Sequence, residues 1–136
     1  MLQVTCAIIE NNGKILCAKR SEKMKLPLKW EFSGGKIEEH ESLEACLKRE
    51  IREELGIEID ILEQLPSFKH SYSANLSIEL FPFRCKSLSQ EIHLAEHKQI
   101  KWLGLEELKD LDWAEADVPI VNYIKTRKNG NRNWSI

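Results

Sequence analysis

The sequence lacks any apolar run near the ~20 residues that a membrane-spanning helix needs. Turn-forming residues are also scarce, with 6 Gly and 4 Pro in 136 residues, and there is no Pro/Gly/Ser-rich linker, internal repeat or biased tract. These absences argue against disorder, collagen and low-complexity arrays. Because 42% of the residues are apolar and 31% are charged, the chain predicts one packed globular domain.

The sequence also has no large excess of positive or negative residues. The 20 Lys and Arg residues stand against 22 Asp and Glu residues, for a net charge of −2, so the overall field gives no reason to expect a nucleic-acid partner. Only the short basic stretch Lys125–Lys128 favours one. The first residues contain neither the basic nor the long apolar segment of a secretory signal. We expect a cytoplasmic protein with no membrane partner, either a monomer or a homodimer.

Closely spaced cysteines are absent as well. The chain has four cysteines that form no Cys-x-x-Cys pair and that each lie in an apolar pattern: Cys6, Cys17, Cys46 and Cys85. We therefore expect reduced thiols that pack as small hydrophobic groups, not disulfides or a thiolate metal site.

The alternation of strand formers and turn residues predicts an α/β or α+β sandwich in one domain over 1–128, with a C-terminal tail at 129–136. The expected strands cover 2–10, 14–19, 30–32, 57–68, 74–86 and 99–103, with an Asn12-Gly13 hairpin turn and a polar turn over 69–73. A helix is expected over 42–55, with Ser42 as its N-cap and Gly56 at its C-terminal end. A helical turn over 105–110 and a helix over 115–127 complete the domain.

Three carboxylates share one side of the expected helix over 42–55. Glu50, Glu53 and Glu54 lie at i, i+3 and i+4, beside the apolar stripe of the helix. Like charges at this spacing repel, and Mg²⁺ is the hard, oxygen-binding cation that would best relieve the repulsion. A solvated helix face is the alternative, since Arg49 and Glu53 make an ordinary i, i+4 ion pair.

A longer motif favours the metal interpretation. Gly35, Glu41, Arg49-Glu50-Ile51-x-Glu53-Glu54 and Gly56-Ile57 stand at the spacing Gly-x5-Glu-x7-Arg-Glu-aliphatic-x-Glu-Glu-x-Gly-aliphatic. Seven fixed residues, each at roughly 7% frequency, would coincide about once in 10⁸ windows. The motif resembles the Nudix hydrolase signature at every position, and the flanking segments resemble the MutT-like branch to about residue 125. The resemblance implies a Nudix α/β/α sandwich with a mixed sheet between helices.

The resemblance also implies an activity and a set of metal ligands. MutT-like members convert a nucleoside triphosphate and water to the monophosphate and diphosphate, with Mg²⁺, or Mn²⁺ in its place. By motif position, Glu50 and Glu54 would be the main ligands, with Glu53 and the Gly34 carbonyl as further ligands. The supporting and catalytic residues would be Arg49 and Glu41, which orient the carboxylates, and Glu53 and Glu96, with Glu96 as general base or auxiliary ligand.

The nucleotide itself would contact other residues. Lys36 and Arg20 are candidates for binding a phosphate oxygen. Candidates for contacting the base are Phe32, Tyr72, Phe81 and Asp117, although core packing is the ordinary role of a strand aromatic and a helix-start anion that of an aspartate. An ionised aspartate only accepts hydrogen bonds, which suits a cytosine amine or a guanine N–H edge. His93 and His97 are expected to be surface histidines.

Nucleotide-pool sanitising, acting on 8-oxo-dGTP or on CTP and modified dCTP, is the function that this resemblance favours. Two alternatives remain: a Nudix hydrolase of dinucleoside polyphosphates, for which Tyr72 is a weak marker, and a non-catalytic nucleotide-binding module, which would not need all the motif glutamates. The sequence leaves open the preferred base and sugar, the number of metal ions, the general base and the oligomeric state.

Overall fold

The protein is described here by a computed structural model that covers residues 1–89 and 91–130. The main elements follow in chain order: β1 (Leu2–Asn11), β2 (Lys14–Lys19), β3 (Trp30–Glu31), β4 (Gly34–Lys36), α1 (Leu43–Leu55), β5 (Ile59–Gln64), β6 (Phe68–Ser73), β7 (Leu76–Ser87), β8 (Gln99–Leu103) and α2 (Val118–Gly130). Two 3₁₀ turns, Leu105–Asp110 and Glu115–Asp117, precede α2.

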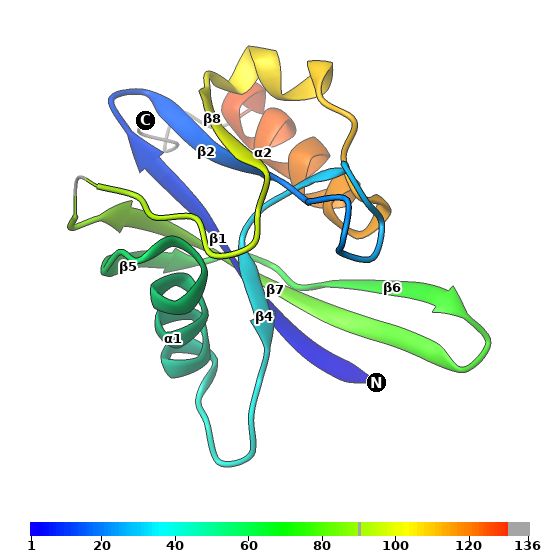
Figure 1. Cartoon of the computed structure of the whole chain (residues 1–136). Coiled ribbons are helices and arrows are strands. Elements are labelled where there is room, and N and C mark those ends of the chain that lie inside the picture. The colour runs from blue at the N-terminus through cyan, green and yellow to red at the C-terminus, as the bar shows by residue number, and fades with distance from the viewer. Residues whose placement is uncertain (90, 131–136) are drawn as a thin grey trace.

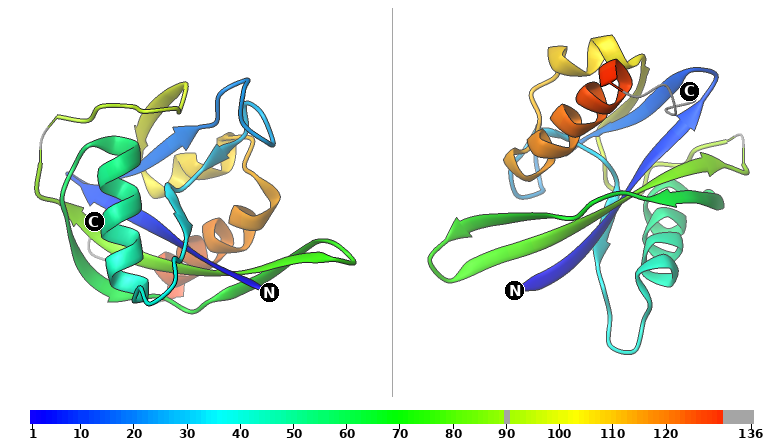
Figure 2. Two further views of the ribbon diagram at one scale, coloured as in Figure 1. Left: turned by 60° about the horizontal axis from the view of Figure 1, so that its bottom comes forward. Right: turned by 180° about the vertical axis from the view of Figure 1, so that it is seen from behind.

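The strands form one mixed sheet between two helical layers. Strand β1 lies at the centre, parallel to β7 and antiparallel to β2 and β4, while β2 also pairs with β3 and β8. Helix α1 covers one face of the sheet and α2 the other (Figures 1 and 2). The predicted α/β sandwich with a mixed sheet is confirmed.

Each face of the sheet has its own hydrophobic core. The core beneath α1 contains the apolar stripe of that helix, Leu47, Ile51 and Leu55, all fully buried. The core beneath α2 contains Ile120 and Ile124 together with aromatic side chains from the loops at the sheet edge. Because apolar burial contributes roughly 25 cal/mol per Å², these two cores fix α1 and α2 against the strands.

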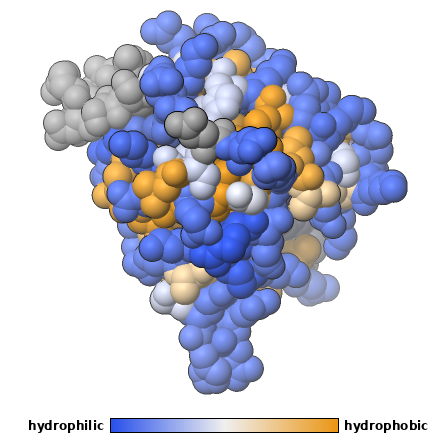
Figure 3. Space-filling view, turned by 60° about the vertical axis from the view of Figure 1, so that its left-hand side comes forward, coloured by the Kyte–Doolittle hydropathy of each residue, from blue (hydrophilic) through white to orange (hydrophobic). Residues whose placement is uncertain are grey.

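The local signals that bound the first elements are confirmed. Asn12 and Gly13 both adopt positive φ, 51° and 79°, in the turn between β1 and β2. The Ser42 hydroxyl accepts a hydrogen bond from the Ala45 N–H, and Gly56 ends α1 in the left-handed conformation with φ 67°. The loop before α1 projects at the bottom of Figures 1 and 3 with a hydrophilic surface.

Other boundaries were predicted wrongly. The polar residues 69–73, expected to be a turn, form β6, which pairs with β7 as an exposed hairpin strand. The expected strand over 57–68 is therefore interrupted after β5. Strand β4 was not expected, because two glycines disfavour strand structure. A Cβ on Gly34 would lie only 1.9 Å from the Thr5 carbonyl oxygen, so glycine is needed for β4 to approach β1.

The C-terminal helix also differs in detail. Residues 115–117 form a 3₁₀ turn, and α2 proper runs from Val118 to Gly130, beyond the expected domain boundary at 128. Residues 131–136 of the predicted tail lie outside the described residues. All four cysteines are buried and free, as expected. Among the described helices, none has both the length and the apolar character to span a membrane.

Candidate active site

The Arg49 side chain forms hydrogen bonds with several carboxylates on and next to α1. Its guanidinium binds both oxygens of Glu41, at 2.7 and 3.0 Å, and one oxygen each of Glu50 and Glu53, both at 2.9 Å. It also donates to the Lys36 carbonyl oxygen at 3.2 Å, which fixes α1 to the end of β4. The Arg49 guanidinium lowers the pKa of Glu41 to about 2. One cation thus holds three acidic side chains in place.

Glu50 and Glu54 face the glycine-rich strand β4. A Cβ on Gly35 would lie 2.3 Å from the Glu50 Cδ, so the missing side chain makes room for this carboxylate. Burial, followed by the negative charges of Glu31 and Glu50, raises the pKa of Glu54 to about 8, while a backbone hydrogen bond from Gly34 acts in the opposite direction. The Glu54 Oε1 atom is buried and has no hydrogen-bond partner among the described residues.

This arrangement fits a hard divalent cation. An unpartnered buried carboxylate oxygen is costly on its own, and oxygen-only donors suit Mg²⁺. Within the described residues, no three acidic, histidine or cysteine side chains already surround one point closely enough to hold a metal. The reason is visible in the contacts, since the Arg49 guanidinium binds Glu50 and Glu53. Metal binding would therefore have to compete with these ion pairs.

A second charged group lies where β3 joins the site. Glu31, which the sequence analysis missed, receives Arg20 Nη1 on Oε1 at 2.7 Å and lies 2.7 Å from His97 Nε2 through Oε2. Arg20, a predicted phosphate contact, is thus engaged with a carboxylate and also donates to the Lys25 carbonyl oxygen. The sheet register alone could have revealed this group, since β2 pairs with β3 on one edge and with β8 on the other.

Asp117 lies beside this group, from the 3₁₀ turn before α2. Its Oδ2 accepts a hydrogen bond from the Phe32 N–H at 2.9 Å, and the residue is 7% exposed. Burial and then the charge of Glu31 raise the pKa of Asp117 to about 8. The raised pKa favours a protonated Asp117 at neutral pH, in contrast to the ionised aspartate expected from the sequence. A protonated Asp117 can donate one hydrogen bond as well as accept others.

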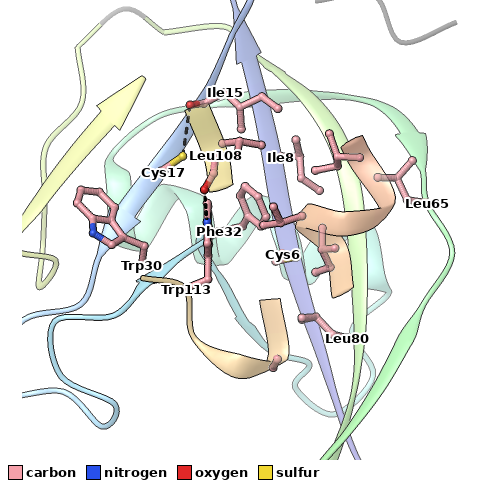
Figure 4. Close-up of a cluster of buried hydrophobic side chains, with 14 of the residues drawn as sticks. Cys6, Ile8, Ile15, Cys17, Trp30, Phe32, Leu65, Leu80, Leu108 and Trp113 are labelled. Atoms are coloured by element: carbon pink, nitrogen blue, oxygen red, sulfur yellow. Dashed lines mark hydrogen bonds between the residues drawn. The ribbon is translucent and has the colours of Figure 1, made fainter. Parts of the chain in front are cut away.

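The three aromatic residues predicted to contact the base lie in different parts of the structure. Phe32 is 3% exposed and packs against Trp113 with ring centroids 4.7 Å apart, in the core beneath α2 (Figure 4). Phe81 packs against the core beneath α1, on the other face of the sheet. Tyr72, on β6, is 41% exposed. Its pKa is raised by partial burial and then by the charge of Asp117, so it faces the same region as that residue.

The remaining predicted residues lie around the carboxylates. Glu96 is exposed, on the segment whose Ala95 N–H donates to the Glu54 carbonyl oxygen at 3.1 Å. Lys36 is exposed and borders a hollow at the start of β1 that contains none of the motif carboxylates. His93 is exposed, as expected, whereas the expectation for His97 is wrong, because its side chain is 1% exposed.

Comparison with known proteins connects this geometry to a family. Residues 1–124 match the family model described as the NUDIX domain. The chain belongs to the Nudix family. The carboxylates around Arg49 are therefore those of the Nudix signature, and the resemblance seen in the sequence extends over nearly the whole domain.

Named relatives agree with this assignment. A CTP pyrophosphohydrolase of Escherichia coli strain K12 is 37% identical over 121 residues, which cover 89% of each chain. An 8-oxo-dGTP diphosphatase of Buchnera aphidicola subsp. Schizaphis graminum is 32% identical over 85% of each chain. The solution structure of the E. coli ORF135 protein has a TM-score of 0.84 and 32% identity, over 98% of this chain and 94% of that one. This Nudix protein is a hydrolase.

Proposed function

We propose that this Nudix protein is a Mg²⁺-dependent nucleoside triphosphate pyrophosphohydrolase, which converts a triphosphate and water to the monophosphate and diphosphate. The observation that carries the proposal is the buried, unpartnered Glu54 Oε1 beside Glu50 and the glycine strand. The names of the relatives, a CTP pyrophosphohydrolase and an 8-oxo-dGTP diphosphatase, support the same class of substrate.

The chain's own residues have separate tasks in this proposal. Glu50 and Glu54 would hold the metal, with Glu53 and the Gly34 carbonyl as further ligands. Bound Mg²⁺ would neutralise phosphate charge and lower the pKa of water. Arg49, fixed by Glu41, keeps the Glu50 and Glu53 carboxylates in orientation. Phosphoryl transfer depends mainly on such positioning and charge stabilisation.

The proton acceptor is assigned to Glu53 or Glu96. Both side chains are exposed and can exchange protons with water, whereas Glu54 is partly buried, with its Oε1 atom fully so. A general base needs a pKa near the working pH and reach to the attacking water. The pH dependence of kcat in Glu53→Gln and Glu96→Gln separates them, because the variant that lacks the base loses the acidic limb of its profile.

For the nucleobase, we propose recognition by Glu31 and Asp117. Glu31 offers carboxylate oxygens, and protonated Asp117 offers an O–H, so the pair supplies acceptors and one donor. A base with an exocyclic amine, which cytosine, guanine and adenine all carry, satisfies such a pair better than uracil does, and the names of the relatives favour cytosine and guanine among these. Tyr72 borders the same region. This preference is consistent with a nucleotide-sanitising role in the cytoplasm on CTP, modified dCTP or 8-oxo-dGTP.

The test is diphosphate release from a panel of ordinary and oxidised nucleoside triphosphates, with a diadenosine polyphosphate included for the alternative branch. We expect Mg²⁺-dependent diphosphate release from cytosine or guanine triphosphates, and a loss of about 10³-fold or more in Glu54→Gln. Glu44→Gln, an exposed carboxylate in the first turn of the same helix, is the matched control and retains full activity. Nucleotide binding without turnover at millimolar Mg²⁺ would instead indicate a binding module.

A further inference from the structure

Sheet register brings three distant segments together around Glu31. Strand β2 pairs Ala18 with Glu31 on one edge and Lys19 with Gln99 on the other. The Lys98 N–H also donates to the Lys19 carbonyl oxygen at 2.9 Å. Arg20, directly after β2, and His97, two residues before β8, therefore meet the Glu31 side chain at the same end of the sheet.

The contacts fix both oxygens of the Glu31 carboxylate. Arg20 Nη1 lies 2.7 Å from Oε1, and His97 Nε2 lies 2.7 Å from Oε2. An ionised carboxylate only accepts hydrogen bonds, so the proton in the second contact belongs to Nε2 of the imidazole. His97 Nδ1 is buried without a hydrogen-bond partner in the described part of the chain, so the contact of the imidazole with Glu31 is made through Nε2. Glu31 is thereby restricted to one orientation.

His97 itself cannot be a substrate contact. Its side chain is 1% exposed, whereas that of Glu31 is 16% exposed. The Glu31 side chain is therefore partly open to solvent, whereas the imidazole is enclosed. Any effect of His97 on the reaction has to act through Glu31, whose neighbour Phe32 is hydrogen-bonded to Asp117 at 2.9 Å.

We propose that His97 is a positioning residue that holds the Glu31 carboxylate in the orientation that selects amine-bearing nucleobases. The proposal rests on the proposed function, since it assigns Glu31 to the nucleobase. A buried histidine could also serve packing alone. Packing would affect all substrates equally, whereas positioning of Glu31 affects the ratio of kcat/KM between a base with an exocyclic amine and one without it.

The experiment compares His97→Gln with His97→Asn. A glutamine amide nitrogen can occupy the place of Nε2 and donate to Glu31, whereas the shorter asparagine leaves the amide near the place of Nδ1. We expect His97→Gln to keep the CTP to UTP ratio of kcat/KM within about twofold, and His97→Asn to lower it about tenfold through KM for CTP. His97→Leu fills the space without a donor and serves as the second variant if His97→Asn is unstable. The control is His93→Asn, an exposed histidine on the same segment.

A double-mutant cycle with Glu31→Gln completes the test. If His97 acts through Glu31, the change from His97→Asn largely disappears in the Glu31→Gln background. An unchanged ratio in His97→Asn and His97→Leu, or an equal change with and without Glu31, overturns the inference while the proposed function stands. A wild-type protein that hydrolyses no nucleoside triphosphate refutes the proposed function first, and the inference with it.

Discussion

The two charged regions of this site solve the same electrostatic problem in opposite ways. Around α1, one guanidinium contacts Glu41, Glu50 and Glu53, and the pKa of Glu41 falls to about 2. At the end of β3, the carboxyl of Asp117 is buried near Glu31, and its pKa rises to about 8. In the first region, Glu41 stays ionised beside Arg49, while burial raises the pKa values of Glu50 and Glu54. The second keeps a proton available for a hydrogen bond.

The difference shows two ways to set the protonation state of a carboxyl group: a neighbouring arginine favours the ionised form, and burial favours the protonated form. Arg49 keeps its partner Glu41 ionised and orients Glu50 and Glu53, whereas burial raises the pKa of Glu54 to about 8, so metal binding there would have to displace a proton. A carboxyl group that is to distinguish bases benefits from a defined protonation state, which desolvation supplies. Glu31, which Arg20 and His97 hold in place, connects the two regions. Its negative charge raises the pKa of Glu54 in the first region and of Asp117 in the second.

The largest expected effect in this comparison comes from Arg49→Lys. Lysine keeps the positive charge but cannot bind Glu41 through two nitrogens while also contacting Glu50 and Glu53. We expect kcat/KM to fall about 100-fold, the upper end of the range for residues that support metal ligands. Steady-state kinetics measures the loss.

Arg52→Lys provides the matched control for that substitution. Arg52 lies on the same helix and forms an ion pair with Glu58, and both side chains are more than half exposed. We expect less than about a twofold change, because exposed ion pairs contribute little. Equal losses in the two variants would show that Arg49 has no special role.

A smaller effect is expected from Asp117→Asn on stability. Between its unfolded pKa near ~3.9 and its folded pKa of about 8, the folded state keeps a proton that the unfolded state has released. The free energy of unfolding of the wild type therefore falls as pH rises through this window, by up to about 1.4 kcal/mol per pH unit for this group. Asparagine removes that slope and still accepts the hydrogen bond from the Phe32 N–H. We expect the variant to be more stable by about 2 kcal/mol at pH 8.

Urea unfolding in metal-free buffer from pH 5 to pH 8 measures this gain. Asp110→Asn, at an exposed position in the 3₁₀ turn after β8, is the control and should follow the wild-type curve. If Asp117→Asn and the wild type give parallel curves, Asp117 is already ionised in the folded protein, and the proposed donor role is lost.

The same comparison explains how much could be predicted from the sequence. The α1 carboxylates, their arginine and the capping residues lie within one continuous motif; helical periodicity predicts the Arg49–Glu53 pair, and the family resemblance implies the orienting roles of Arg49 and Glu41. Glu31, Arg20 and His97 are far apart in sequence and meet only through the register of β2 with β3 and β8. No local pattern encodes that register, so His97 was assigned to the surface and Arg20 to phosphate.

Strand predictions failed for a related reason. The polar strand β6 has no alternating apolar pattern, because as an exposed hairpin strand it buries little, and only its pairing with β7 defines it. Strand β4 has two glycines that local propensity disfavours, yet β1 and Glu50 leave no room for side chains there. In both cases the tertiary environment overrides local preference.

The central claim is that the carboxylates of α1 bind a divalent cation, and Mn²⁺ binding measured by electron paramagnetic resonance tests it most directly. We predict that the wild-type protein binds Mn²⁺, that Mg²⁺ displaces it, and that Glu50→Gln and Glu54→Gln each weaken binding at least about tenfold, with Glu44→Gln unchanged. Equal Mn²⁺ affinity in the wild type and in both substituted proteins would contradict the account.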